Sequence, residues 1–240
     1  MNKIDKLQEL INESNNIVFF GGAGVSTASG LKDFRSKDGL YNEKDNILNV
    51  SPEFMLSSVC FYSFTKEFYK YYKSKMNSLN AKPNIIHKYL SKLEKEGKLK
   101  AIITQNIDGL HQAAGSKNVL ELHGTIHKNH CIKCNKEYSA EYVFNSTDIP
   151  NCICGGIIKP NVVLYGEMLP DDFNIAIDYI SKCDLLIVAG TSLTVEPASS
   201  LINYFHGKNL VIINNDNTSY DNKATLVIND DLSKVFNSLT

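Results

Sequence analysis

Five short runs of consecutive apolar residues recur along the chain, and apolar and polar positions do not alternate within them. The runs lie at residues 17–20, 101–103, 162–164, 185–189 and 210–213. Strands that are covered on both faces have this pattern, which is typical of a parallel sheet between two layers of helices. The pattern therefore predicts five buried strands.

Amphipathic patterns with a helical period separate several of these runs. Apolar residues recur at spacings of three and four over residues 85–93, and Gly97 is placed to end that helix. A second helix is expected to start near Asp171 and a third to run over about residues 197–205, while residues 1–14 form an amphipathic helix. The alternation of strands and helices predicts an α/β fold with a doubly wound, Rossmann-like parallel sheet.

Two stretches depart from this alternation and predict a smaller inserted domain. Residues 36–80 are rich in aromatic side chains at helical spacing, which indicates a helical module with its own core rather than an aromatic ligand site. Residues 125–158 hold four cysteines and indicate a zinc-binding ribbon. The predicted Rossmann-like domain then comprises residues 1–35, 81–124 and 159–240.

The four cysteines of the insert are spaced as metal ligands. They form a C-x-x-C pair and a tighter C-x-C pair, whose members are Cys131, Cys134, Cys152 and Cys154. Together they supply four thiolates for a tetrahedral Zn²⁺ ion and leave no position for water, so the metal is expected to be structural. Buried or redox-active thiols are the alternative, but the spacing favours zinc. His127 and His130 lie near enough to replace one ligand, although four cysteines suffice.

Composition and charge narrow the class of partner. The 240 residues carry a net charge of −1 with dispersed lysines, which argues against nucleic acid because that partner requires a basic face. The N-terminal segment lacks the apolar core of a signal peptide, and no apolar run is long enough to span a membrane. We therefore expect a cytoplasmic protein with no membrane partner, in which the six cysteines are ligands or buried thiols. The oligomeric state stays open, with a monomer as the expectation.

The segment GGAGVSTASGLKDFR, residues 21–35, follows the first predicted strand directly. A glycine-rich turn at the end of a strand lets backbone N–H groups approach a phosphate that a side chain would keep away. Arg35 is the only arginine of the chain, and its planar fork of donors suits a phosphate or a ribose–phosphate corner. The segment therefore predicts a nucleotide-binding loop.

Polar or small residues follow other predicted strands, where a doubly wound sheet binds its ligands. The segment 104–111 offers amide and carboxylate groups suited to ribose hydroxyls and a carboxamide. His123 ends another short strand beside Gly124, which favours a general base over a purely structural histidine. Gly-Thr-Ser at 190–192 and Asn-Asn at 214–215 follow two more strands. Together with the first loop, these segments predict one crevice lined from several strand ends.

The residues within and after the segment 21–35 argue against a nicotinamide-dependent dehydrogenase. Thr27 stands where the dinucleotide fingerprint places a third small residue. The acid that binds ribose in such enzymes ends an apolar strand about 20 residues further on. Glu43 and Asp45 have that spacing, but they lie in a polar stretch.

Taken together, these segments resemble the sirtuin family of NAD-dependent protein deacylases, in the form of the bacterial catalytic core. The matching blocks occur in the family's order, span nearly the whole chain, and are specific only in combination. They are Gly22–Ser26, Ser29–Arg35, Thr104–His111, His123–Gly124, the four cysteines, Pro160–Glu167, Gly190–Ser192 and Asn214.

The resemblance implies roles for individual residues. The first loop would hold the pyrophosphate and its ribose, the segment after residue 103 the nicotinamide and its ribose, and the C-terminal strand ends the adenosine. The residues implied in NAD binding are Gly22, Ala23, Gly24, Thr27, Asp33, Phe34, Arg35, Gln105, Asn106, Ile107, Asp108, His123, Gly190, Thr191, Ser192, Asn214, Asn215 and Asp231. Val163 and Tyr165 would lie along an acyl-lysine tunnel, and the segment after Pro160 would pair with the substrate backbone as an added strand.

The resemblance also implies the reaction. The acyl oxygen of a modified lysine attacks C1′ of the nicotinamide ribose of NAD, and nicotinamide leaves. His123 then acts as general base on a ribose hydroxyl, with Asn106 as a second catalytic residue, and water completes the release of lysine and O-acyl-ADP-ribose. The implied partner is an acylated-lysine protein or peptide. The helical module contains no arginine, which favours acetyl or another neutral acyl group over a negatively charged one.

Two other functions stay open: mono-ADP-ribosyl transfer to protein, and a non-catalytic NAD or ADP-ribose sensor. The presence of Asn106, Asp108 and His123 argues against the sensor, because a sensor needs no base. The chain also departs from the family pattern at three places. Lys32 stands for the usual proline, Tyr165 for the usual phenylalanine, and the second cysteine pair is C-x-C.

Overall fold

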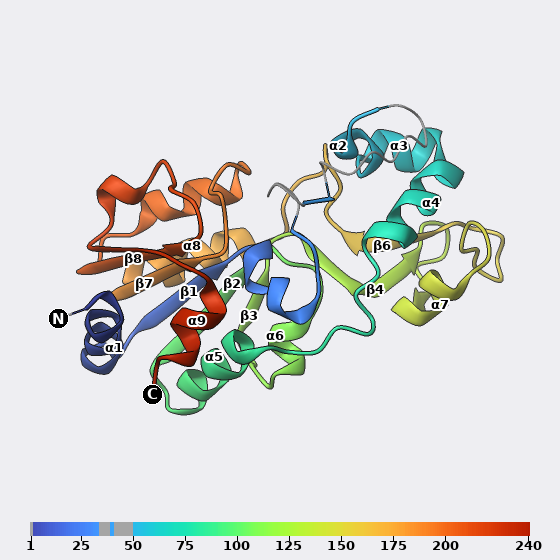
Figure 1. Ribbon diagram of the computed structural model, residues 1–240. Helices are drawn as coiled ribbons and strands as arrows, with labels where there is room; N and C mark the ends of the chain where they lie inside the picture. Colours follow the sequence, from blue (N-terminus) through green and yellow to red (C-terminus); the bar gives the residue numbers. More distant parts are fainter. Residues whose placement is uncertain (1, 34–38, 41–49) are drawn as a thin grey trace.

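The computed structural model of the chain describes residues 2–33, 39–40 and 50–240. Figure 1 shows a larger lobe, built around one sheet and carrying both termini, and a smaller lobe of short helices around a second sheet. The chain passes between the two lobes several times, so segments far apart in sequence meet where the lobes join.

The larger lobe is organised on six parallel strands in the order β3-β2-β1-β7-β8-β9. Every residue of β1 and β7 is buried, as their uninterrupted apolar sequences predict. The strand order reverses between β1 and β7, and such a switch point is where doubly wound sheets bind ligands. The predicted Rossmann-like sheet is therefore confirmed. Its strands are β1 (Ile17–Gly21), β2 (Leu99–Thr104), β3 (Val119–Glu121), β7 (Leu185–Ala189), β8 (Asn209–Asn214) and β9 (Leu226–Asn229).

Helices cover both faces of this sheet (Figure 1). On one face α1, α5 and α9 share a core with Ile17 and Phe19 of β1, and on the other α8 and η4 share a core with Val18 and Phe20. This division follows from the alternation of side chains along a strand. The covering elements are α1 (Lys3–Glu13), α5 (Ile85–Lys95), α8 (Asp172–Lys182), α9 (Leu232–Asn237) and the 3₁₀ helix η4 (Ala198–Tyr204).

Local hydrogen bonds explain where these helices begin and end. Asn84 caps α5 by accepting a backbone N–H of its first turn, and Gly97 follows the helix with a φ of 74°. The segment predicted as a helix over 197–205 is a 3₁₀ helix instead. The Pro197 carbonyl accepts both the backbone N–H (3.1 Å) and the hydroxyl (2.6 Å) of Ser200, which favours the tighter i to i+3 geometry.

The prediction of a buried parallel strand at residues 162–164 is wrong. The strand here is β6 (Ile158–Val162), which pairs antiparallel with β4 (Gly124–Cys131) in a separate sheet of order β5-β4-β6. Pro160 lacks a backbone N–H and is tolerated in an edge strand such as β6, but not in the middle of a parallel sheet. The edge strand β9, whose apolar run comprises residues 226–228, is not among the predicted strands.

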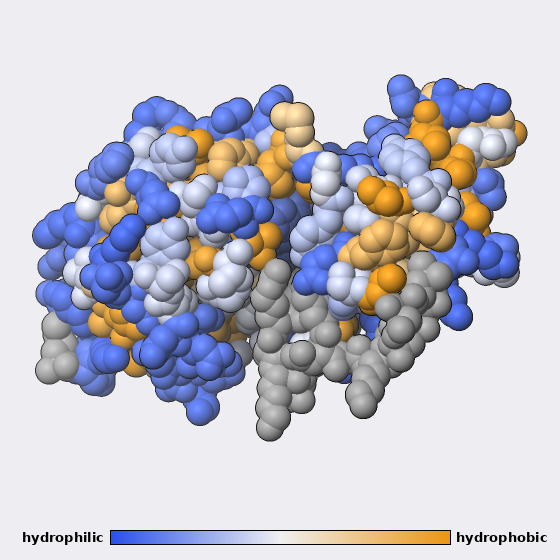
Figure 2. All heavy atoms as spheres, turned by 90° about the horizontal axis from the view of Figure 1, so that it is seen from above, coloured by the Kyte–Doolittle hydropathy of each residue, from blue (hydrophilic) through white to orange (hydrophobic). Residues whose placement is uncertain are grey.

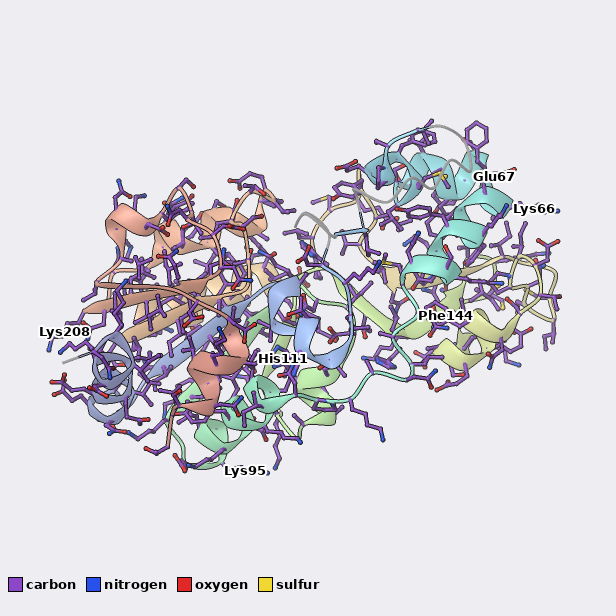
Figure 3. The ribbon with its side chains drawn as sticks, viewed as in Figure 1. Lys66, Glu67, Lys95, His111, Phe144 and Lys208 are labelled. Atoms are coloured by element: carbon purple, nitrogen blue, oxygen red, sulfur yellow. The ribbon has the colours of Figure 1, made fainter. Side chains whose placement is uncertain are left out.

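The smaller lobe has one core, which the helical segment and the cysteine-rich segment share. Tyr72 stacks on Phe68 and on Phe144, with ring centroids 5.5 Å apart in both pairs (Figure 3 labels Phe144). Cys131 is buried in the same cluster. The two segments therefore do not have separate cores, and the predicted domain boundary at residue 159 falls within β6. The remaining elements are α2 (Pro52–Met55), α3 (Ser58–Ser63), α4 (Thr65–Lys75), β5 (Glu137–Tyr138) and α7 (Ala140–Asn145).

The surface is mixed rather than dominated by one kind of side chain. Seen from above, polar side chains predominate on the larger lobe, and apolar ones take a larger share on the smaller lobe (Figure 2). Among the helices of the described residues, none has the length and apolar composition needed to cross a membrane.

Candidate active site

A cleft of about 470 Å³ opens at the carboxyl ends of the parallel strands, where the two lobes meet. Loops after β1, β2, β7 and β8 reach it from the larger lobe, and residues 162–169 reach it from the smaller one. The structure thus brings most of the predicted site together. The predicted residues that line the cleft are Ala23, Gly24, Thr27, Asp33, Gln105, Asn106, Ile107, Asp108, His123, Val163, Tyr165, Gly190, Thr191, Ser192, Asn214, Asn215 and Asp231.

Of the predicted NAD- and substrate-binding residues that the structure describes, only Gly22 does not line the cleft. Phe34 and Arg35 lie outside the described residues, so their predicted roles stay predictions. Gly22 is described but lies behind the cleft wall, where its N–H donates to the Ala189 carbonyl at 3.1 Å. A Cβ on Gly22 would lie 2.7 Å from the Cβ of Thr191, so glycine is needed here for packing between two loops.

The glycine-rich loop is folded against the loop that follows β7. It forms two short 3₁₀ turns, η1 (Ala23–Val25) and η2 (Thr27–Ser29). The Gly24 N–H donates to the Gly190 carbonyl at 2.9 Å, and a Cβ on Gly24 would lie 2.8 Å from the Gly190 Cα. Because these two loops flank the switch point of the sheet, their close approach forms one wall of the cleft.

A buried polar cluster joins the first loop to the segment after β2. The Ser26 hydroxyl donates to the Asp108 carboxylate at 2.7 Å and accepts from the Asn106 side-chain amide at 3.0 Å. The same amide donates to the Gly22 carbonyl at 3.1 Å. Burial raises the pKa of Asp108, although the Ser26 and Leu110 hydrogen bonds oppose that shift. Ser26 is a site residue that the sequence analysis did not assign.

His123 lies in the cleft with one ring nitrogen already engaged. Its Nδ1 is 2.9 Å from the backbone carbonyl of Gln105, and a carbonyl oxygen can only accept. Nδ1 therefore carries the proton, and Nε2 of the neutral ring keeps a free lone pair. Burial lowers the pKa of His123, against the opposing effect of the Gln105 carbonyl, so the neutral form is favoured. This is the protonation state that a general base requires.

Gln105 supplies a donor suited to a polar ligand. Its Oε1 accepts from the Thr191 hydroxyl at 3.2 Å. Its Nε2 is buried and has no hydrogen-bond partner among the described residues. A buried donor without a partner is unfavourable by about 1–3 kcal/mol, so this amide fits a site in which a hydroxyl-rich ligand supplies the acceptor.

The opposite end of the cleft is built from the ends of β7 and β8 and the start of α9. The Asn214 amide donates to the Thr191 carbonyl at 3.1 Å, which ties the two strand ends together. The Asp231 carboxylate accepts the Lys234 N–H at 3.0 Å as the N-cap of α9. Asp231 therefore lines the cleft and also has a structural role.

The segment after β6 forms the wall on the side of the smaller lobe. The Val163 N–H donates to the His123 carbonyl at 2.9 Å, and the Tyr165 N–H donates to the Leu56 carbonyl at 3.0 Å. Apolar side chains that the sequence analysis did not assign to the site also line this part of the cleft. They are Leu40, Leu56, Tyr72, Met76, Val162, Leu164 and Leu169. Most belong to segments whose apolar residues also build a core, so their sequence pattern alone did not distinguish the two roles.

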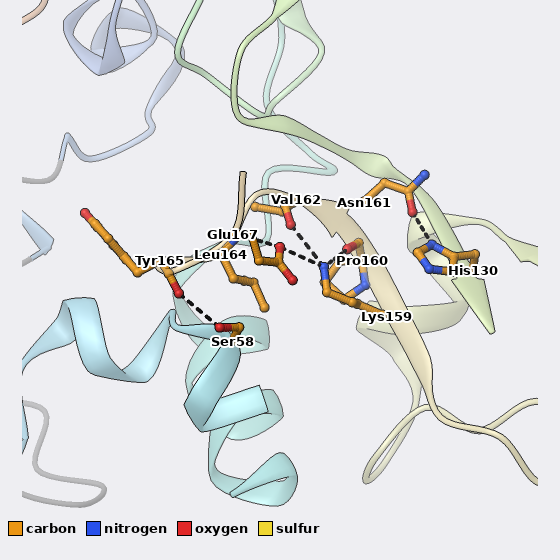
Figure 4. Close-up of polar contacts among 9 residues, drawn as sticks. All are labelled: Ser58, His130, Lys159, Pro160, Asn161, Val162, Leu164, Tyr165 and Glu167. Atoms are coloured by element: carbon orange, nitrogen blue, oxygen red, sulfur yellow. Dashed lines mark hydrogen bonds and ion pairs between the residues drawn. The ribbon is translucent and has the colours of Figure 1, made fainter. Parts of the chain in front are cut away.

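An ion pair closes this segment into a loop (Figure 4). Lys159, which is only 9% exposed, places its Nζ 3.1 Å from the Glu167 carboxylate and within 3.4 Å of the Pro160 and Val162 carbonyls. Glu167 also accepts the Leu164 N–H at 2.9 Å. The pair therefore connects the start of the segment to its end and fixes the residues between them.

For the activity that the sequence resemblance implies, replacing Glu167 by glutamine is expected to raise the KM for an acylated peptide about fivefold while leaving the KM for NAD unchanged. The loss of charge weakens the bond to Lys159 by about 1 kcal/mol, since the carboxylate is partly exposed. Steady-state kinetics with each substrate varied in turn measures the effect. Asp178→Asn is the matched control, because Asp178 pairs with Lys182 on the surface of α8. Equal increases in both KM values would contradict this role.

The four predicted cysteines meet at one end of the smaller lobe. Their sulfur atoms all lie within 4.8 Å of one another, and three of the pairs are separated by 3.4–3.5 Å. A tetrahedral zinc site with Zn–S bonds of about 2.3 Å places sulfurs about 3.8 Å apart, so the arrangement fits the metal. The Lys133 N–H points to Cys131 Sγ at 3.4 Å, a contact that stabilises a thiolate. His127 is engaged elsewhere, with Nε2 2.9 Å from the Asp108 carbonyl.

These features define a Rossmann-type α/β protein with a four-cysteine metal module and a cleft that joins a nucleotide loop, a neutral histidine and an apolar wall. Residues 22–197 match the model of the Sir2 family. The chain belongs to the Sir2 family, and the predicted resemblance to sirtuins is confirmed.

Curated relatives match this chain over nearly the whole length of both proteins. The chain is 57% identical over 236 residues to an "NAD-dependent protein deacetylase" of Clostridium perfringens, covering 97% of this chain and 96% of that protein. It is 55% identical to the protein of the same name from Clostridium tetani, covering 97% and 95% of the two chains.

Solved Sir2 structures superpose closely on the whole chain. One, a Sir2 variant with a deacetylated p53 peptide and 3′-O-acetyl-ADP-ribose, has a TM-score of 0.90 and 40% identity, covering 99% of this chain and 97% of that one. A Sir2 complex with a p53 peptide and NAD⁺ has a TM-score of 0.86 and 42% identity, covering 98% and 96%. A Sir2 protein bound to a propionylated peptide has a TM-score of 0.86 and 40% identity, with the same coverage.

Proposed function

We propose that this chain removes acetyl or other neutral acyl groups from protein lysines, using NAD as co-substrate and releasing nicotinamide and O-acyl-ADP-ribose. The observation that carries the proposal is the position of His123. Its free Nε2 belongs to a cleft that has the nucleotide loop on one side and the apolar segment after β6 on the other. The names of the curated relatives and the ligands of the Sir2 structures support the same activity.

NAD would lie across the switch point of the sheet. The first loop would hold the pyrophosphate, with Ala23 and Thr27 at the cleft surface. Asn106 and Asp108, fixed by their bonds to Ser26, would orient the nicotinamide ribose and carboxamide. The side-chain Nε2 of Gln105, which has no partner among the described residues, would donate a hydrogen bond to a ribose oxygen. The adenosine would be contacted by Thr191, Ser192, Asn214, Asn215 and Asp231. Phe34 and Arg35 of the first loop would complete the site.

His123 would act on a ribose hydroxyl after nicotinamide has left. The acyl oxygen of the modified lysine displaces nicotinamide from C1′, and Nε2 of His123 then takes the proton of the hydroxyl that attacks the acyl carbon. The Gln105 carbonyl stabilises the imidazolium that results, because it accepts the hydrogen bond that Nδ1–H donates. Water finally releases the lysine, and the acyl group stays on ADP-ribose.

The acylated lysine would enter along the segment after β6. Val163 and Tyr165 would flank its side chain, and the segment would pair with the peptide as an added strand. The apolar lining suits an uncharged acyl group. Lys75 also lines the cleft, so a succinylated peptide is an informative comparison.

A panel of acetylated, propionylated and succinylated peptides with NAD tests the proposal. We expect nicotinamide release only when an acylated peptide is present, and O-acyl-ADP-ribose detectable by mass. With labelled NAD, stable label on the protein would instead indicate mono-ADP-ribosyl transfer. Nucleotide binding with no turnover on any peptide would indicate a sensor.

The pH dependence of the reaction should follow the protonation of His123. Because burial lowers the pKa of this imidazole below its ordinary value of 6.5, the base stays neutral at pH 7 and is lost only as the pH falls through the lowered pKa. We expect kcat/KM for the acetylated peptide to be flat near neutral pH and to fall on the acidic side of pH 6.5. A decline that begins above pH 7 would contradict this assignment.

The partner of the enzyme is proposed to be an acylated protein rather than nucleic acid or a membrane. Acidic and basic residues are nearly equal in number, which argues against a nucleic-acid partner. The segment after β6, proposed to pair with a peptide, supports a protein partner. A cytoplasmic location and a monomeric state are proposed with it. Fractionation of cells and light scattering of the purified protein are the measurements that test them.

A further inference from the structure

Asn84, at the start of α5, contacts the nucleotide loop from outside the cleft. Its side-chain Nδ2 donates to the Val25 carbonyl at 2.8 Å and to the Ser29 hydroxyl at 3.0 Å, so both of its protons are used. These two acceptors bracket Thr27, which lines the cleft. The side chain of Asn84 itself is not among the residues that line it.

The position of Asn84 is itself fixed by α5. Its Oδ1 accepts the Ile86 N–H at 2.9 Å as the helix N-cap, and its backbone N–H donates to Nδ1 of His87 at 3.2 Å. His87 is fully buried and packs against the ring of His111, which Figure 3 labels in the interior of the larger lobe, with centroids 4.7 Å apart. Burial lowers the pKa of His87 to about 4, so its ring stays neutral and can accept this bond.

The loop is thus held from two sides. On the side of the cleft, Ser26 bonds to Asp108 and Asn106, and the Gly24 N–H bonds to the Gly190 carbonyl. On the opposite side, Asn84 provides the side-chain contacts to Val25 and Ser29. Gly30, with a φ of 83°, follows immediately and turns the chain away. Loss of the outer contacts would leave the turn η2 held mainly by its own backbone.

We propose that Asn84 is a positioning residue for NAD, which acts through the loop it holds and touches neither substrate. The proposal rests on the proposed function only in assigning NAD to this loop. Asn84 contacts the nucleotide loop and not the segment after β6. Its loss should therefore weaken the binding of NAD and leave the binding of the acylated peptide unchanged.

Two substitutions separate this role from helix capping. Asn84→Asp keeps the oxygen that caps α5 but replaces the donor by an oxygen that repels the Val25 carbonyl, whereas Asn84→Ala removes both functions. We expect Asn84→Asp, which keeps the cap of α5, to melt within about 2–4 °C of the unmodified chain and to bind ADP-ribose and NAD about tenfold more weakly by calorimetry. Its KM for NAD should rise in parallel, with the KM for the peptide unchanged.

Asn2→Asp is the matched control, because Asn2 caps α1 through the Asp5 N–H and lies outside the cleft lining. Ser29→Ala is a second test that leaves the cap of α5 intact, and it should weaken ADP-ribose binding about threefold. Unchanged ADP-ribose affinity in Asn84→Asp, or equal increases in both KM values, would overturn the proposal. Calorimetry with ADP-ribose needs no turnover, so this result stands even if no acyl peptide is a substrate.

Discussion

Replacement of His123 by alanine is expected to slow the release of acyl-ADP-ribose by at least about 100-fold at saturating NAD and peptide. General-base catalysis contributes about 10²–10⁴ to such reactions. The cleft places His123 between the nucleotide loop and the apolar wall, and its Nδ1 bond to the Gln105 carbonyl leaves Nε2 as the acceptor. The measurement is single-turnover formation of the acylated nucleotide, followed by mass.

His206→Ala is the control for this substitution, because His206 is exposed and lies outside the cleft lining. Calorimetric binding of NAD by the His123 variant should stay within a few-fold of the unmodified chain, since the loop, Asn106 and Asp108 are left in place. Undiminished turnover in the variant would refute the assignment of the base. A loss of NAD binding equal to the loss of rate would instead indicate a binding role.

Removal of zinc is expected to unfold the smaller lobe and abolish activity with it. Structural zinc sites contribute about 10–16 kcal/mol of apparent binding free energy, which becomes folding free energy when the site does not exist in the unfolded chain. Cys131 ends β4, and the paired strand β6 leads directly into the segment that lines the cleft. Loss of the metal should therefore also disorder the segment proposed to bind the peptide. The prediction applies equally to chelation and to Cys131→Ala.

Hydrogen exchange read by mass is the decisive measurement for zinc. Faster exchange should spread over β4, α7 and β6, while β1 and β7 in the larger lobe keep their protection. Elemental analysis should find one zinc per chain, and none after Cys131→Ala. Cys183→Ala serves as the control, because Cys183 is buried beside α8 and is not part of the cysteine cluster. A chelated protein with unchanged exchange and full activity would rule out a structural metal.

The sequence predicts the centre of the fold best, because there a single physical requirement decides the pattern. Val18, Phe20 and their neighbours must be apolar on both faces of β1, so an uninterrupted run marks the strand. Residues at the ends of such strands gather at one edge of the sheet. The crevice around Gln105, Asp108 and His123 could therefore be predicted before any side chain was placed.

Contacts between distant segments set the limit of sequence-based prediction. The run at 162–164 has the composition of a strand, but only Val162 belongs to one. That strand, β6, is placed by antiparallel pairing with β4, which no local pattern encodes. Ser26 reaches Asp108 across 82 positions, and Asn84 reaches Val25 across 59. Each of these residues is a common loop or cap residue in its own neighbourhood. Its significance comes from a partner that only the folded chain supplies.

The stack of Phe68, Tyr72 and Phe144 limits how the preference for acyl groups can change. Tyr72 forms part of the cleft wall and is also the middle ring of a packed stack that joins α4 to α7. Replacing such a ring by a small residue leaves a cavity and costs about 3–5 kcal/mol of stability, a large fraction of what a domain of this kind has. A wider pocket for longer acyl chains would thus require compensating substitutions elsewhere in the same core. A change of acyl preference at Tyr72 is therefore coupled to the stability of the smaller lobe.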